Sequence, residues 1–232
     1  YVGFPTEGDN MQNNDLLVKL PLFEGMPADD IPVILKRLGS YSKKYKRNDF
    51  IKTAGDPIDF IGIVLEGSIQ VLQDDYYGNR NIRAHFGQGA LFAEAFACAG
   101  VKFLPVDILA SDDAEILFIN SNSIFASCGG RCEYHHTLIT NLLKIVAQKN
   151  MLMNQKLKYS SHKTTKEKLM AFLHDQSRIN KSKEFTIPFD RQALADYLGV
   201  ERSAMSTEIN KLVKQGIIET KRSYFRLIRT TE

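Results

Sequence analysis

The C-terminal part of the chain contains the segment FDRQALADYLGVERSAMSTEINKLVKQGIIETKRSYFRLI, residues 189–228. Asp190 can cap a first helix, and Gly199 suits the tight turn that ends it. A second helix is predicted from about Arg202 to Gln215, because the glycine after it stops the helix. The small residue Ala195, midway along the first helix, allows the second helix to approach closely. This pattern is typical of a helix-turn-helix.

The two faces of the predicted second helix differ in character. One face is apolar and is expected to pack inward through Ala204, Met205, Ile209 and Leu212. The other face carries side chains that can hydrogen-bond and none that is acidic, namely Arg202, Ser203, Ser206, Thr207 and Asn210. A helical subdomain with a polar solvent face is the plain alternative. The small residue, the glycine and the apolar register together favour a helix that reads base edges in the major groove.

The residues after this helix, IIETKRSYFRLI, predict two short strands around Lys221-Arg222-Ser223. Lys221 and Arg222 would form a basic wing that rests on phosphates. The charge of the chain agrees with this. Residues 1–158 contain 16 Lys and Arg against 18 Asp and Glu, whereas residues 159–232 contain 14 against 9, so that the two parts carry −2 and +5. We therefore expect double-stranded DNA as a partner.

The composition of the 232 residues is ordinary for a globular protein, with 44% hydrophobic and 25% charged residues. No stretch approaches the roughly 18 apolar residues of a membrane-spanning helix, so no membrane is expected as a partner. The first residues show no basic segment followed by an apolar one, so no secretory signal is expected. Three cysteines do not make a disulfide framework, and reduced thiols indicate the cytoplasm.

Residues 45–120 show short alternating apolar runs with closely spaced turn signals, which predict an antiparallel barrel, roll or sandwich. Tight hairpins are expected at Glu66-Gly67, at residues 77–80 and at residues 86–89. The last strand is expected at residues 114–120. These glycines serve turns, because no GxGxxG motif opens a helix and no GKS or GKT occurs.

From about Cys132 to Lys158 the pattern becomes helical, without Pro or Gly. An a/d seam runs through Ile139, Leu143, Val146, Asn150, Met153 and Leu157. A second apolar stripe beside it contains Leu138, Leu142, Ile145 and Leu152. The plain interpretation is that the two stripes form one wide apolar face that is buried in the core of the domain. Two stripes instead suit a helix that packs on its own domain and on a partner, and Asn150 could fix the register of a homodimer.

After a hinge-like Ser160-Ser161, a helix is predicted at about residues 164–177, with Thr164 or Thr165 near its N-cap, and a short strand at EFTIP, residues 184–188. The predicted organisation is α+β, with an antiparallel β-roll and an N-terminal helical segment at 1–131, a long dimerisation helix at 132–158 and a winged helix-turn-helix at 159–232.

This order of parts resembles the CRP/FNR superfamily of bacterial transcription regulators over roughly residues 16–230, and RQALADYLGVERSAMS is its most specific segment. The resemblance implies a cyclic-nucleotide-binding-like β-roll, an inverted-repeat operator bound by a homodimer, and RNA polymerase among the candidate partners. It also implies that Arg191 and Gln192 lie near DNA phosphates and that Arg202 reads a guanine. Ser203 and Thr207 depart from the Glu and Arg common in the family, so the base preference does not carry over.

In that family a Gly-Glu pair followed by Arg-Ser or Arg-Thr binds the cyclic phosphate. Here Ala93-Glu94 and Leu104-Pro105 stand at those places. Burying a phosphate without a cation or several donors costs several kcal/mol. We therefore expect a small-molecule effector that is not a cyclic nucleotide. Its pocket is expected to contain Ala93, Glu94, Leu104 and Pro105, together with Met153 and Asn154 of the long helix.

Other chemistry has weaker support, and we expect no cofactor and no metal. Cys98, Cys128 and Cys132 are one thiolate short of a cubane cluster. Cys128 and Cys132 could still form a redox pair, and His135-His136 could hold a metal or haem. A cupin-like enzyme is disfavoured because His85 is the only histidine of the β region. A DNA-binding protein without any effector remains a further alternative.

Overall fold

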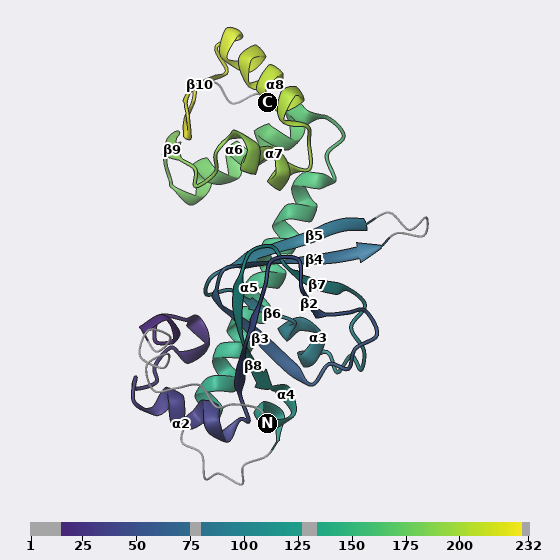
Figure 1. The fold of residues 1–232 in the computed structure, drawn as a ribbon. Coiled ribbons are helices and arrows are strands. Elements are labelled where there is room, and N and C mark those ends of the chain that lie inside the picture. The colour runs from purple at the N-terminus through teal and green to yellow at the C-terminus, as the bar shows by residue number, and fades with distance from the viewer. Residues whose placement is uncertain (1–14, 75–79, 127–133, 229–232) are drawn as a thin grey trace. The chain divides into compact units, whose positions relative to one another are not determined.

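The computed structural model describes residues 15–74, 80–126 and 134–228. The chain forms two compact units, Tyr1–Ala147 and Gln148–Glu232, and helix α5 (His135–Ser160) contributes to both (Figure 1). No helix among the described residues is long and apolar enough to cross a membrane. Each unit is described separately below.

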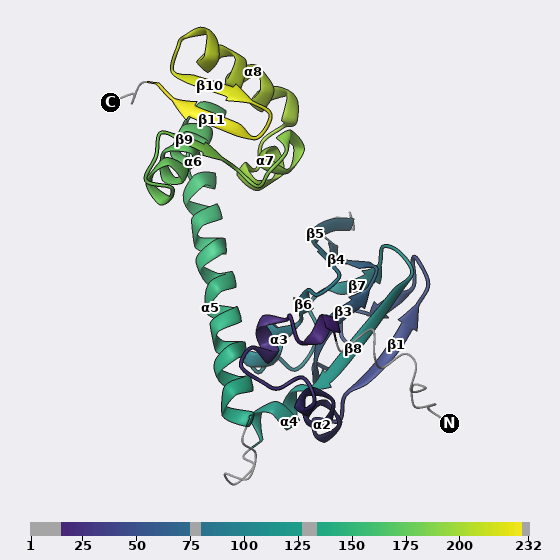
Figure 2. The same cartoon turned by 90° about the vertical axis from the view of Figure 1, so that its left-hand side faces the viewer.

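The first unit is built on two antiparallel sheets of four strands each. One sheet has the order β1 (Tyr41–Tyr45), β8 (Ala114–Asn120), β3 (Phe60–Glu66) and β6 (Leu91–Phe92). The other has the order β2 (Phe50–Lys52), β7 (Asp107–Ala110), β4 (Ser68–Asp74) and β5 (Arg80–Gly87). Figure 2 shows β1, β3 and β8 side by side. The predicted antiparallel β-roll is confirmed.

The strand pairing corrects two of the predicted hairpins. Strand β3 pairs with β6 and β8, and β4 pairs with β5 and β7, so Glu66-Gly67 joins the two sheets instead of closing a hairpin. Gly67 has a φ of +76°, and a Cβ there would lie 2.2 Å from the carbonyl oxygen of Asp113. The close passage between the sheets therefore requires glycine. Residues 86–89 likewise connect β5 to β6, which lie in different sheets. The turn predicted at 77–80 lies mostly outside the described residues.

Strand β3 is buried on both of its faces, which explains its unbroken apolar sequence. Ile61, Ile63 and Leu65 pack into a core shared with the helical elements η1 (Pro21–Phe23), α2 (Asp30–Arg37) and α5. Phe60 and Val64 pack into the core of the β-roll with residues of strand β8. Two short helices, α3 (Glu94–Cys98) and α4 (Ser121–Phe125), complete the unit.

The first turns of α5 are fastened to this unit by one apolar stripe and one buried amide. Leu138 and Leu142 are almost completely buried, and Ile145 packs against them in part. The Asn141 Nδ2 donates to the carbonyl oxygens of Leu22 and Glu24 at 3.1 and 2.8 Å. The fourth predicted member of the stripe, Leu152, is 58% exposed and does not take part.

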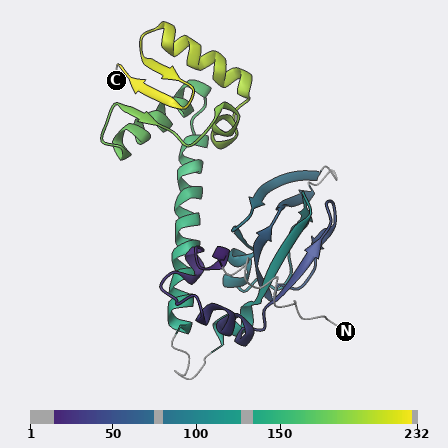
Figure 3. The same ribbon diagram turned by 60° about the vertical axis from the view of Figure 1, so that its left-hand side comes forward.

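The second unit contains α6 (Thr165–Ile179), α7 (Arg191–Leu198) and α8 (Arg202–Lys214), and its sheet has the order β10 (Ile218–Lys221), β11 (Tyr224–Leu227) and β9 (Glu184–Thr186). Thr164 caps α6, and Thr164 and Glu167 form a capping box. Figure 3 shows the two wing strands in yellow beside α8. The predicted winged helix-turn-helix is confirmed.

Candidate DNA-binding surface and effector pocket

Local sequence signals build the helix-turn-helix. The Asp190 carboxylate caps α7 by accepting from the backbone N–H of Ala193 at 2.8 Å. Gly199 ends α7 with a φ of +61°, a conformation that costs glycine little. Ala195 is fully buried in the core of the second unit. Both the cap and the turn therefore lie where the sequence predicts them.

One face of α8 anchors the helix and the other is open. Met205, Ile209 and Leu212 are buried as predicted, whereas Ala204 is exposed, so its assignment to the packed face is wrong. Met205, Ile209 and Leu212 are spaced three to four residues apart and therefore share one face of the helix, whereas Ala204, one position before Met205, lies off that face. The predicted contact residues are Arg202, Ser203, Thr207 and Asn210, which are exposed, and Ser206, which is half-buried.

The wing is a tight antiparallel hairpin in which Lys221 lies opposite Tyr224. Lys221 and Arg222 are exposed, and Arg222 adopts a left-handed conformation with a φ of +53°. The Ser223 Oγ donates to the carbonyl oxygen of Phe189 at 3.0 Å, which fixes the turn to the residue before the α7 cap. Two basic side chains are therefore presented on a turn that is held in place.

Arg191 joins α7 to the wing. Its Nη2 donates to the Thr220 Oγ1 at 2.8 Å, and the Thr220 hydroxyl donates to the Tyr224 carbonyl oxygen at 2.8 Å. The guanidinium carbon lies 4.9 Å from the centre of the Phe225 ring. Burial lowers the pKa of Arg191, but a guanidinium stays charged in proteins. Sequence spacing gives no signal for this bond, because Arg191 and Thr220 lie far apart in the chain, and the phosphate contact of Arg191 stays a prediction.

Two further side chains form hydrogen bonds, one along α7 and one to the turn that follows it. The Gln192 Nε2 donates to the Asp196 Oδ1 at 2.9 Å on the exposed side of α7. The Lys168 Nζ on α6 donates to the carbonyl oxygen of Gly199 at 3.3 Å. Lys168 was missed by the sequence analysis because nothing local to α6 points to the turn.

The end of α5 is anchored in the second unit next to the predicted hinge at Ser160-Ser161. The Tyr159 ring is almost completely buried, and its centre lies 5.7 Å from that of Phe172. Asp175 on α6 accepts from the Lys158 Nζ at 2.6 Å and from the Tyr159 hydroxyl at 3.1 Å.

These contacts shift the ionisation of both partners. Burial raises the pKa of Tyr159, and the bond to Asp175 raises it further. For Asp175, burial acts to raise the pKa, but the hydrogen bonds from Lys158 and Tyr159 outweigh it, so the pKa lies below its usual value. Burial and these bonds together hold the last turn of α5 to α6.

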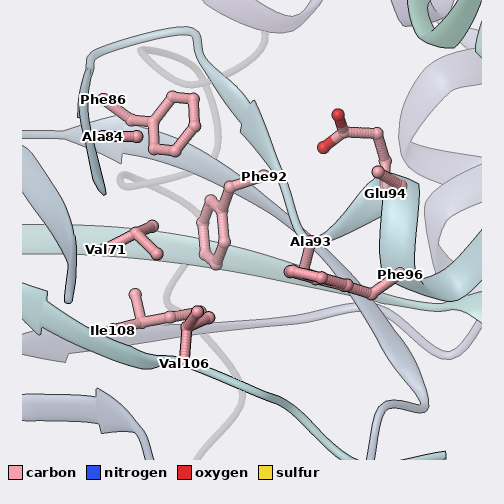
Figure 4. A pocket seen from close by; sticks show the side chains of 10 residues that line it. Val71, Ala84, Phe86, Phe92, Ala93, Glu94, Phe96, Val106 and Ile108 are labelled. Carbon is pink, nitrogen blue, oxygen red and sulfur yellow. The ribbon is translucent and has the colours of Figure 1, made fainter. Parts of the chain in front are cut away.

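A pocket of about 190 Å³ opens in the β-roll (Figure 4). Its lining is Val71, Ala84, Phe86, Phe92, Ala93, Glu94, Ala95, Phe96, Val106 and Ile108. Ala93 and Glu94 line this pocket, and their role in effector binding stays a prediction. Ala93 adopts a left-handed φ of +62° at the start of α3, and Glu94 is 4% exposed.

The other four residues predicted for the pocket are not among its lining. Leu104 is buried in the β-roll core, where its backbone N–H donates to Asp56 and its carbonyl accepts from Gly55, each at 2.8 Å. Pro105 is exposed. Met153 and Asn154 are exposed on the part of α5 that belongs to the second unit, and their role in effector binding stays a prediction.

Among the described residues, no group of three or more His, Cys, Asp or Glu could hold a metal. Cys98 is exposed. Its thiol is still partly desolvated, which raises its pKa, and the nearby Glu94 raises the pKa further. A raised thiol pKa disfavours the reactive thiolate. The predicted redox pair Cys128 and Cys132 lies outside the described residues.

The chain matches two protein-family models. Residues 42–128 match the cyclic nucleotide-binding domain, and residues 167–231 match the Crp-like helix-turn-helix domain. The two matches cover the β-roll and most of the winged unit. No curated protein matches the sequence.

Solved structures with the same architecture include two bacterial regulators. CLP of Xanthomonas campestris, described as a c-di-GMP responsive global regulator, is 18% identical with a TM-score of 0.52, and the match covers 88% of this chain and 100% of that one. DNR from Pseudomonas aeruginosa is 16% identical with a TM-score of 0.50, and the match covers 98% and 96%. These likenesses concern the fold. Because a cyclic nucleotide-binding domain is followed by a Crp-like helix-turn-helix domain, the chain belongs to the CRP/FNR superfamily.

Proposed function

We propose that the chain acts as a homodimeric, sequence-specific DNA-binding regulator whose affinity for DNA responds to a small molecule. The observation that carries this proposal is the open face of α8. Arg202, Ser203, Thr207 and Asn210 are exposed there, while the opposite face is buried in the core of the unit. Arg202 can donate hydrogen bonds, and the other three side chains can both donate and accept them, which suits base edges; the exposed basic wing suits the flanking phosphates.

The homodimer is supported by the exposure of the seam on α5. Leu143, Met153 and Leu157 are each more than 60% exposed, and Ile139 and Val146 are partly so. A row of large apolar side chains left in water on one helix is typical of a surface that a partner covers. Asn150 lies in this row and can pair with its symmetry mate, which would fix the register of a parallel pair of helices.

A twofold dimer predicts the form of the operator. Two recognition helices related by symmetry read an inverted repeat whose half-site centres lie about 10 bp apart, or one helical turn. We expect this regulator to act in the cytoplasm, with RNA polymerase as a candidate partner at the promoter.

The effector is proposed to be a small molecule other than a cyclic nucleotide. The relative from Xanthomonas is described as c-di-GMP responsive. Among the described residues that line the β-roll pocket there is no Lys, Arg or His, and the one ionisable side chain is that of Glu94. A cyclic phosphate in this pocket would lack a cationic partner.

Selection of binding sites from random double-stranded DNA tests the proposed function. The expected product is an enriched inverted repeat, to which two chains bind per duplex in analytical ultracentrifugation. Recovery of a single motif without symmetry, bound by one chain, would contradict the dimer. Recovery of no enriched sequence would contradict specific recognition.

A further inference from the structure

The β-roll pocket has the volume of a site for one small ring. Apolar cavities of about 150 Å³ in proteins stay dry and take up benzene. The pocket here has a volume of about 190 Å³. This is enough for one six-membered ring with a small substituent and falls below the roughly 300 Å³ at which sites for drug-sized ligands begin.

The walls of the pocket are apolar and partly open to water. Phe92, Val106 and Ile108 form a buried floor, whereas Val71, Ala84, Phe86 and Phe96 are only half-buried. Figure 4 shows Val71, Phe86 and Phe92 of the sheets grouped with Val106 and Ile108, and Phe96 of α3 beside them. A ligand that covers these walls removes apolar surface from water, which favours binding.

The charge of the pocket selects against anions. Glu94 is the one ionisable side chain among the ten that line it. A carboxylate or phosphate on the ligand would lose its water without meeting a Lys, Arg or His among these ten described residues. Three phenylalanine rings, Phe86, Phe92 and Phe96, instead offer edges and faces to a second aromatic ring.

We propose that this pocket binds an uncharged, mainly apolar compound with a single ring, such as a substituted benzene. The inference deepens the proposed effector response by naming the class of the effector. Ligand binding is measured on the protein without DNA, so that the inference and the proposed DNA-binding function can fail separately.

The test compares three probes that share one ring and differ in charge: toluene, benzylamine and benzoate. The full chain, with ¹³C-labelled methyl groups on Val and Ile, is titrated with each probe at pH 7. Toluene is expected to shift the methyl signals of Val71 and Ile108. At about five times its Kd it is expected to raise the Tm by about 2 to 4 °C. Benzoate is expected to do neither, and benzylamine to bind more weakly than toluene.

A matched pair of variants locates the site. Ala84→Leu adds three carbons inside the pocket, and Ala99→Leu adds the same carbons at an exposed position outside the lining. Toluene binding is expected to weaken at least tenfold in A84L and to stay unchanged in A99L. Binding that is equal in both variants, or absent from the parent protein, would overturn the inference. Preferential binding of benzoate or cyclic AMP would overturn it as well.

Discussion

At the scale of single residues, two arginines of the winged unit have different surroundings. Arg202 is exposed at the first position of α8. Arg191 bonds to Thr220 and lies against the Phe225 ring. We therefore expect Arg202 to contact a base and Arg191 to act mainly by positioning the wing.

The first prediction compares Arg202→Ala with Lys221→Ala. Loss of a base contact should cost about 1 to 3 kcal/mol on the operator and relax the preference at one base pair of each half-site. Lys221→Ala should weaken operator and random DNA alike and flatten the salt dependence by about one unit of slope. Fluorescence anisotropy over a salt series measures both. Equal losses on operator and random DNA for R202A would contradict the assignment of Arg202.

The second prediction concerns Ala93, which holds a left-handed φ at the edge of the pocket. This conformation costs an alanine roughly 1 to 2 kcal/mol, and glycine avoids that cost. Glycine also gains conformational entropy in the unfolded chain, which offsets part of this gain. Ala93→Gly should therefore raise the free energy of unfolding by a net amount of about 0.5 to 1 kcal/mol. Ala97→Gly inside α3 is the control and should lower it. Urea unfolding checks both, and a destabilised A93G would show that φ is relaxed in solution.

At the scale of elements, the junction of α5 and α6 is a buried anchor built from Tyr159 and Asp175. The pKa of Asp175 is lower in the folded state than in the unfolded chain. Its contribution to stability is therefore complete above the unfolded pKa, near 4, and is lost as the pH falls through the folded value.

The third prediction follows from the lowered pKa of Asp175. Asp175→Asn should destabilise the second unit at pH 7, and the difference from the parent chain should shrink as the pH falls from about 5 to about 3. Tyr159→Phe removes one hydrogen bond and should cost about 0.5 to 1.5 kcal/mol at pH 7. Urea unfolding at several pH values provides the measurement. A difference for D175N that is constant over this range would show that Asp175 ionisation does not support the anchor.

The fourth prediction tests the α5 seam. The double variant Leu143→Asp, Val146→Asp would place unpaired charges in the proposed dimer interface, so it should give monomers that lose specific DNA binding. Leu152→Asp is the control, because Leu152 is exposed on the same helix but lies outside the seam. Analytical ultracentrifugation distinguishes the outcomes. A dimeric double variant would mean that another surface joins the subunits.

What the sequence predicts depends on how local the signal is. Asp190 and Gly199 act on their own helix, and both were assigned correctly. The apolar run of β3 identified the strand, but its partners lie far away in the chain, so the turn at Glu66-Gly67 was misassigned as a hairpin. Leu104 is a second case in which a distant contact decides the position. Its place in the family motif suggested a pocket residue, but its side chain is buried in the β-roll core and is not among the described lining.

At the scale of the whole molecule, effector binding is proposed for the first unit and DNA binding for the second. The described lining of the β-roll pocket is mainly apolar and has no Lys, Arg or His, and the winged unit exposes the polar face of α8. Helix α5 contributes to both units. If a ligand in the pocket changes DNA affinity, the coupling expected for such systems is 5- to 150-fold, or about 1 to 3 kcal/mol.

The central claim is that the winged unit recognises a DNA sequence. Its most direct test is the ratio of the affinities of the full chain for the selected operator and for random DNA of the same length, measured by fluorescence anisotropy at 150 mM salt. Specific regulators bind their sites typically 10³-fold or more tightly than other DNA. We predict a ratio of at least about 10³ that falls at least tenfold in R202A. A ratio near one for the parent chain would contradict the claim.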